Sequence, residues 1–149
     1  MTQGKREDPF ELERFIKAQE GIYDTALSEL QAGRKRSHWM WFIFPQIDGL
    51  ARSSTAGYFA IKSVDEAKAY LEHPVLGPRR QECTRTLLSL NGKSASDVFG
   101  YPDDLKFCSS MTLFDLAAPG NDLFADALDK YFAGERDQKT LSLLHGKNA

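Results

Sequence analysis

A basic and aromatic stretch, RKRSHWMWFIFPQ at residues 34–46, holds the side chains of this sequence best suited to bind a ligand. Arg36 could contact a phosphate, because a planar guanidinium matches the geometry of phosphate oxygens. His38 could supply a polar contact, and Trp39, if exposed beside it, could stack on a base or a sugar ring. Gln46 could recognise a base edge or a carboxamide. We therefore expect these four side chains in one binding site.

Each of these residues also has a structural interpretation. His38 could be an ordinary hydrogen-bonded histidine, Arg36 could belong to a solvated helix end, and Gln46 could satisfy backbone groups of its own loop. The core is the expected place for the other aromatic residues of the stretch: Trp41, Phe42 and Phe44. An aromatic side chain buries about 150–250 Å², so these residues would hold the stretch in place.

A second polar group is expected on a helix that begins at Pro102. Asp103, Lys106 and Ser110 have the spacing i, i+3 and i+7, so they share one helix face. Asp103 and Lys106 most simply form an intrahelical ion pair worth a few tenths of a kcal/mol, about 0.2–0.5. Ser109 and Ser110 lie among apolar residues. Small hydroxyl residues in that setting indicate either close helix packing or the wall of a pocket.

Together the two segments predict a site for a nucleotide-like or other anionic small molecule, without a cofactor. In an enzymatic version, Lys106 or Arg36 would hold a phosphate and Trp39 would stack. Asp103 or Asp104 would then act as the acid or base. The chain contains no nucleophile-elbow, zinc-protease, P-loop or dinucleotide-binding motif, so no reaction is indicated. The alternative is a non-catalytic protein–protein interaction module whose aromatic run forms an exposed apolar patch.

Composition excludes several classes of protein. The net charge of −2 over 149 residues disfavours a nucleic-acid binder. No apolar run reaches the roughly 20 residues of a membrane span, and the polar N-terminus lacks the apolar segment of a signal peptide, so a cytoplasmic protein is expected. Three histidines and two cysteines without clustered spacing predict no metal site. No feature of the sequence indicates an oligomeric state.

The pattern of apolar residues predicts an all-α protein with one compact domain over residues 8–145, preceded by a flexible tail at residues 1–7. We expect six to eight helices in an irregular orthogonal bundle. One helix is predicted from Pro9 to just before Gly33, with Asp8 as its N-cap. Periodicity does not distinguish helix from strand for the apolar run at residues 39–44. Further helix starts are expected at capping residues or prolines: Ser63, Pro78, Ser94, Pro102, Asn121 or Asp122, and Asp137.

Several motifs of this chain occur in a combination found in one known family. They are SHWMWFIFPQ (37–46), GL (49–50), EA and YL (66–71), HP and LG (73–77), and D, K and SSMTLF (103–114). Over about residues 8–144 the chain resembles the bacterial family catalogued as domain of unknown function 1810. That resemblance implies an all-helical fold and no established activity. Ala51 departs from it, because a second glycine is expected there.

Two further resemblances bear on function. A calpastatin label sometimes accompanies such sequences, but calpastatin-type inhibitors are disordered, whereas this chain is patterned to fold. The arrangement of Tyr70-Leu71, Leu87-Leu88, Asp97 and Gly100 is loosely similar to the helical NAD/ADP-ribose-associated family. Its members act on N-glycosidic bonds, so this similarity implies a further alternative, an N-glycosidase with an ADP-ribose-type substrate. Such fold-level analogy does not itself carry function.

Overall fold

The computed structural model of the protein describes residues 8–50 and 53–147 and confirms the all-α prediction. Within these ranges it has ten helices, and seven of them have seven or more residues. In chain order they are α1 (Glu13–Gln19), α2 (Tyr23–Gln31), α3 (Met40–Ile43), α4 (Ser54–Phe59), α5 (Val64–Glu72), α6 (Leu76–Ser89), α7 (Ala95–Phe99), α8 (Asp103–Ala117), α9 (Leu123–Phe132) and α10 (Gln138–Lys147). The predicted tail and Ala51 lie outside the described residues.

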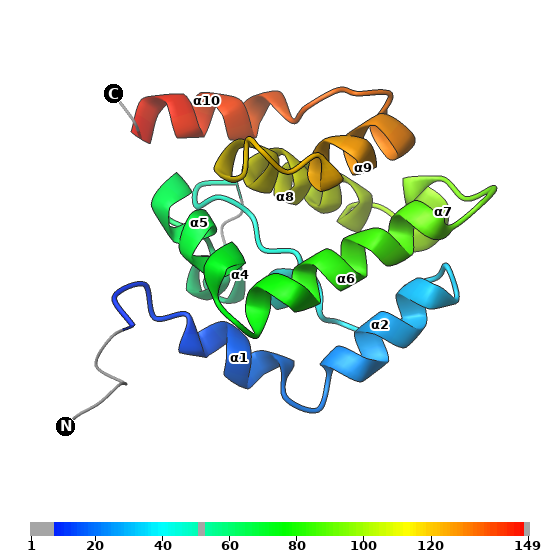
Figure 1. The fold of residues 1–149 in the computed structure, drawn as a ribbon, viewed down its shortest axis with the longest axis horizontal. Helices are drawn as coiled ribbons and strands as arrows, with labels where there is room; N and C mark the ends of the chain where they lie inside the picture. The colour runs from blue at the N-terminus through cyan, green and yellow to red at the C-terminus, as the bar shows by residue number, and fades with distance from the viewer. Residues whose placement is uncertain (1–7, 51–52, 148–149) are drawn as a thin grey trace.

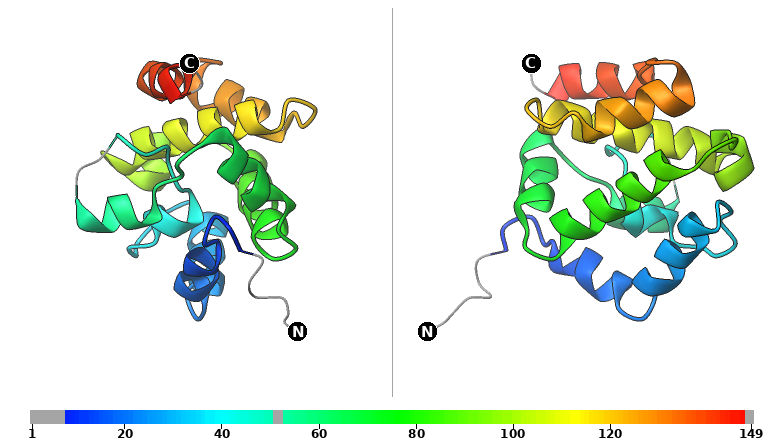
Figure 2. Two further views of the ribbon diagram at one scale, coloured as in Figure 1. Left: turned by 90° about the vertical axis from the view of Figure 1, so that its left-hand side faces the viewer. Right: turned by 45° about the vertical axis from the view of Figure 1, so that its right-hand side comes forward.

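Helix α8 is the central element of the bundle. It packs against α5, α7, α9 and α10, while α6 packs against α2, α5 and α9. Figures 1 and 2 show α1 and α2 at one end of the molecule and α10 at the opposite end. Along α8, every residue from Ser109 to Phe114 is buried, which is typical of a helix covered on all sides. None of the described helices is long and apolar enough to cross a membrane.

The single helix predicted from Pro9 to Gly33 is wrong, because the structure has two helices there. Gly21 separates α1 from α2 with a φ of 74°, a left-handed conformation that ends a helix. The apolar stripe continues across this break, and for that reason the sequence pattern concealed it. The predicted start of that helix is wrong as well: Glu11 has a left-handed φ of 55°, and α1 begins at Glu13 with Leu12, not Asp8, as its N-cap. The Asp8 carboxylate instead accepts hydrogen bonds from the backbone N–H groups of Leu12 and Glu13, at 2.8 and 3.0 Å, from four and five residues away.

Two of the predicted helix starts show how capping residues act locally. The Ser63 hydroxyl accepts a hydrogen bond from the Glu66 amide at 3.1 Å and begins α5. At α7, Ser94 and Asp97 form a complete capping box. The Glu66 side chain does not complete such a box. It forms a buried ion pair with Arg14 at 2.7 Å and so joins α5 to α1.

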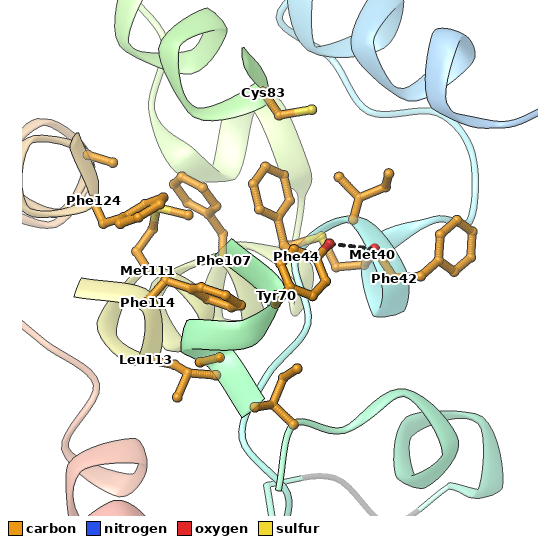
Figure 3. Packing of buried hydrophobic residues seen from close by; sticks show 14 of the residues in the cluster. Met40, Phe42, Phe44, Tyr70, Cys83, Phe107, Met111, Leu113, Phe114 and Phe124 are labelled. Carbon is orange, nitrogen blue, oxygen red and sulfur yellow. Dashed lines mark hydrogen bonds between the residues drawn. The ribbon is translucent and has the colours of Figure 1, made fainter. Parts of the chain in front are cut away.

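The hydrophobic core is built around aromatic residues, as Figure 3 shows for Phe44, Tyr70 and Phe114. The Phe44 ring makes edge-to-face contacts with Phe99 and Phe107, with centroid separations of 6.0 and 5.2 Å. Such pairs contribute about 0.5–1.5 kcal/mol beyond the area that they bury. Phe42 and Phe44 are core residues, as predicted, and the contact of Phe44 with Phe107 fixes the end of α3 against α8.

Arg80 of α6 lies inside this core, with 1% of its surface exposed. Its guanidinium is 3.7 Å from the centroid of the Phe114 ring, and it donates to the Ser110 hydroxyl at 2.7 Å and to the Ile43 carbonyl at 3.4 Å. Among the described residues no carboxylate forms an ion pair with it, and its Nε has no partner. Burial lowers the pKa of Arg80 accordingly. Aromatic faces and hydroxyl or carbonyl oxygens thus replace the anionic partner expected for this cation.

Candidate ligand-binding site

A pocket of about 250 Å³ lies between the segment that precedes and begins α3 and the first turn of α8. It is lined by Lys35, His38, Met40, Trp41, Tyr101, Pro102, Asp103 and Lys106. Two of the predicted ligand-binding residues, His38 and Lys106, therefore share one pocket although distant segments supply them. Packing of Phe44 against Phe107 brings these two segments together.

The charges of the pocket are unequal. Asp103 accepts from two lysines: its Oδ2 is 2.9 Å from Lys35 Nζ and its Oδ1 is 3.4 Å from Lys106 Nζ. Lys35 also donates to the Ser37 carbonyl at 2.5 Å and has only 9% of its side chain exposed, so its ammonium group is fixed. The Lys106 side chain is 26% exposed. Two lysines against one carboxylate leave one net positive charge among these three groups, and Lys106 is the cation available to a ligand.

Trp39 and Trp41 have the opposite of their predicted roles. Trp39 is 0% exposed, and its indole N–H donates to Glu29 at 2.9 Å, so the prediction of a stacking surface at Trp39 is wrong. Trp41, predicted in the core, is half-buried and lines the pocket. Lys106 Nζ lies 5.7 Å from the centroid of the Trp41 ring, which places a cation beside the accessible indole.

Ser109 and Ser110 do not line the pocket. Both are buried, and the Ser109 hydroxyl donates to the Leu105 carbonyl of its own helix at 3.1 Å. Ser110 donates to the Pro45 carbonyl at 2.8 Å and accepts from Arg80 at 2.7 Å. Their assignment to the ligand site is therefore wrong. Of the two interpretations of these small hydroxyls, close helix packing is the one that the structure shows.

Arg36 and Gln46 lie outside the pocket as well. The Arg36 side chain is exposed and lines none of the described pockets, while its backbone N–H donates to Glu29 at 2.8 Å. Gln46 lines a separate cavity of about 20 Å³, behind Trp41. That volume suffices for about one water molecule. Trp41 borders both spaces, so it separates Gln46 from His38 and prevents the single site expected from the sequence.

Glu29, near the end of α2, holds the segment that carries the site. Its carboxylate accepts four hydrogen bonds: from the Arg36 and Ser37 amides at 2.8 and 3.0 Å, from the Ser37 hydroxyl at 2.6 Å, and from the Trp39 indole at 2.9 Å. Partial burial acts to raise the pKa of Glu29, but these four bonds outweigh it and lower the pKa to about 2. No sequence pattern pointed to Glu29, because its partners lie seven to ten residues away across a helix end.

Replacing Glu29 with Gln is expected to lower the free energy of unfolding by about 1–3 kcal/mol at pH 7, because the charge-assisted bonds to this segment are weakened. A carboxyl whose folded pKa lies below its ordinary value of 4.5 stabilises the protein above that pH. This contribution is lost as the pH falls toward 2. The difference in the free energy of unfolding between the wild type and the variant should therefore become smaller from pH 5 to pH 3. Urea unfolding at several pH values measures it.

The exposed Glu20 provides the matched control for that substitution. Glu20→Gln should change the free energy of unfolding by less than about 0.5 kcal/mol. Equal losses for the two variants, or a Glu29→Gln gap that stays constant with pH, would contradict the anchoring role of the Glu29 carboxylate.

The two carboxylates considered as a catalytic acid or base are both engaged. Asp103 pairs with two lysines. Asp104 is absent from the pocket lining, and its Oδ1 accepts from the Leu105 amide at 2.8 Å. The pocket thus offers cationic and aromatic contacts to a ligand, and its carboxylate serves to organise the lysines.

Fold and pocket define a class of protein: a small all-helical domain with a cationic and aromatic pocket at the start of its central helix. The chain belongs to the family described as "Protein of unknown function (DUF1810)", which matches residues 9–144 and confirms the resemblance seen in the sequence. It is similar to the solved structure of the conserved hypothetical protein Rv1873 from Mycobacterium tuberculosis. The two chains are 51% identical with a TM-score of 0.91, over 93% of this chain and 99% of that one. No curated protein matches the chain.

Proposed function

We propose that the protein binds a small, nucleotide-like anionic molecule in the pocket formed by His38, Trp41 and Lys106. The observation that supports this proposal is the convergence of a partly exposed lysine, a histidine and an accessible indole on one cavity of about 250 Å³. Concave sites with a few convergent polar groups on an apolar wall are the usual form of small-molecule sites. The ligand's anionic group would contact Lys106 and His38.

The charge of the pocket favours an anion over a cation. Asp103 is the sole carboxylate among the lining residues, and Lys35 and Lys106 both contact it. A ligand cation would therefore face two ammonium groups, whereas an anion would gain a contact with Lys106 at the cost of weakening a 3.4 Å ion pair. A surface ion pair is worth only about 0–1 kcal/mol, and this one is long and partly exposed, so its loss is readily offset.

The alternative, a protein–protein interaction module, required the aromatic run to form an exposed patch. Most of that run is buried: Trp39, Met40, Phe42, Ile43 and Phe44. Trp41 is its half-exposed member, and it faces the pocket. We therefore favour a small ligand, and we propose binding without assigning a reaction, because the carboxylates near the pocket are already engaged.

A thermal-shift screen of nucleotides, NAD, ADP-ribose and sugar phosphates tests this proposal. A ligand at about 100 times its Kd should stabilise the protein by about 2.7 kcal/mol, which is roughly 5–10 °C for a domain of this size. Lys106→Ala should weaken binding by about 10- to 100-fold, because a hydrogen bond to a charged group is worth about 1.5–3 kcal/mol.

Lys17→Ala is the control, since Lys17 is exposed on α1 and does not line the pocket. It should leave the shift unchanged. A flat response of the wild-type protein across the screen would remove the proposal. A shift that survives Lys106→Ala would place the ligand elsewhere.

A further inference from the structure

We infer that the pocket takes one aromatic ring system bearing one phosphate group, the class of a nucleoside monophosphate, rather than a dinucleotide or a bare phosphate. This inference rests on the proposed function and narrows its ligand. Four properties of the pocket carry it: its aromatic walls, the position of its accessible cation, its volume and the position of its one carboxylate.

The aromatic walls are Trp41 and Tyr101, which come from α3 and from the residues just before α8. Tyr101 is 81% exposed, an unusual position for a large aromatic side chain, and it lies at a pocket that an accessible indole also lines. A planar ring covers such surfaces well, since bases stack on aromatic side chains irrespective of their sequence. A bare phosphate or sugar phosphate would leave both walls unused.

The position of the cation relates the ring to the phosphate. Lys106 Nζ lies over the Trp41 ring at 5.7 Å from its centroid, so the ammonium group is at the face of the indole and not at a remote end of the cavity. His38 lines the same pocket. A ligand that stacks on Trp41 and also reaches Lys106 must therefore carry its anionic group close to its ring.

Volume and charge limit the size of the ligand. At about 250 Å³ the pocket lies just below the roughly 300–1,000 Å³ of sites that enclose drug-sized ligands, so it holds about one nucleoside unit and leaves the second unit of a dinucleotide outside. Asp103 lies within 3.4 Å of the lysine that would hold the phosphate, and its negative charge opposes a second phosphate next to the first. One ring and one phosphate satisfy both conditions.

The test is a calorimetric titration of the wild-type protein with matched probes. The probes are the four common nucleoside monophosphates, their nucleosides, ribose 5-phosphate and ADP-ribose. At least one nucleoside monophosphate should bind about tenfold or more tightly than its nucleoside, ribose 5-phosphate and ADP-ribose, because it alone supplies both contacts in the space available. Its binding should change the fluorescence of Trp41, and this change should be absent in Trp41→Phe.

Two variants separate the contributions of the ring and of the phosphate to the affinity. Trp41→Leu should weaken nucleoside monophosphate binding by about fivefold or more and leave ribose 5-phosphate binding unchanged. Lys106→Ala should weaken the binding of the nucleoside monophosphate and of ribose 5-phosphate, and it should leave the binding of the nucleoside unchanged. Thermal unfolding of each variant, compared with the wild type, shows whether it is folded.

The outcomes distinguish this inference from the proposed function. Ribose 5-phosphate binding as tightly as every nucleoside monophosphate, with dependence on Lys106, would overturn the inference and leave an anion site. ADP-ribose binding more tightly than the monophosphates would also overturn it, in favour of a larger substrate. No detectable binding by any phosphate would overturn both.

Discussion

Replacing Arg80 with Ala is expected to lower the free energy of unfolding by about 3–5 kcal/mol. The substitution removes a long side chain packed against the Phe114 ring at 3.7 Å, and it leaves the Ile43 carbonyl without the donor at 3.4 Å. For a domain of this size that loss lowers the melting temperature by roughly 6–20 °C. Urea denaturation and differential scanning calorimetry measure it.

Arg80→Met is the informative comparison, because it keeps most of the packing volume and removes the charge. A buried cation without a carboxylate partner bears a desolvation cost, and replacing such groups with apolar side chains of similar volume is often neutral or stabilising. We expect Arg80→Met to stay within about 1.5 kcal/mol of the wild type. If Met loses as much as Ala, the hydrogen bonds to Ser110 and Ile43 provide the stability, and the interpretation of Arg80 as a packing element fails.

Gly77→Ala is expected to destabilise the protein by more than about 3 kcal/mol, beyond the usual range for overpacking. A Cβ atom at Gly77 would lie 2.0 Å from the backbone oxygen of Leu71 and 3.0 Å from its carbonyl carbon. Both neighbours are backbone atoms of α5, so no side-chain rotation relieves the contact. The start of α6 would have to move away from α5, which would also displace Arg80.

Gly57→Ala is the matched control for this substitution. Gly57 lies within α4, and a Cβ atom there meets no described atom within 4 Å. Alanine should leave stability unchanged or raise it by up to about 1 kcal/mol, because it lowers the entropy of the unfolded chain. Comparable losses of stability at Gly57 and Gly77 would contradict this explanation. They would show that the change depends on placing alanine in a helix, and not on the close approach of α6 to α5.

Neither Arg80 nor Gly77 lines the pocket. The Arg80 substitution therefore also yields a prediction about ligand binding. Arg80 does not line the pocket, and it reaches the segment that carries the site through the Ile43 carbonyl and through Ser110, which in turn donates to Pro45. A folded Arg80→Met protein should therefore keep its affinity for the ligand of the Lys106 pocket. Ligand titration of that variant checks this, and a loss of affinity without a loss of folding would implicate the Ser110 contacts in shaping the site.

By itself the sequence determined the helical class and most helix starts, because these depend on contacts within one or two turns. Ser63 and Ser94 cap as predicted, since a side chain three residues from its backbone partner needs no tertiary structure to reach it. The pairing of Asp103 with Lys106 is equally local. From their chemical type the sequence also predicted His38 and Lys106 as ligand-binding residues, and both line the pocket.

Only the tertiary structure decided which polar and aromatic side chains reach the pocket. Trp39 is buried because Glu29 of another helix accepts its indole N–H, and Ser110 is buried because Arg80 and Pro45 satisfy its hydroxyl. Partners at such separations leave no periodic signal in the sequence. Such contacts between distant segments decide which of the two indoles is buried. For that reason the accessible indole is that of Trp41.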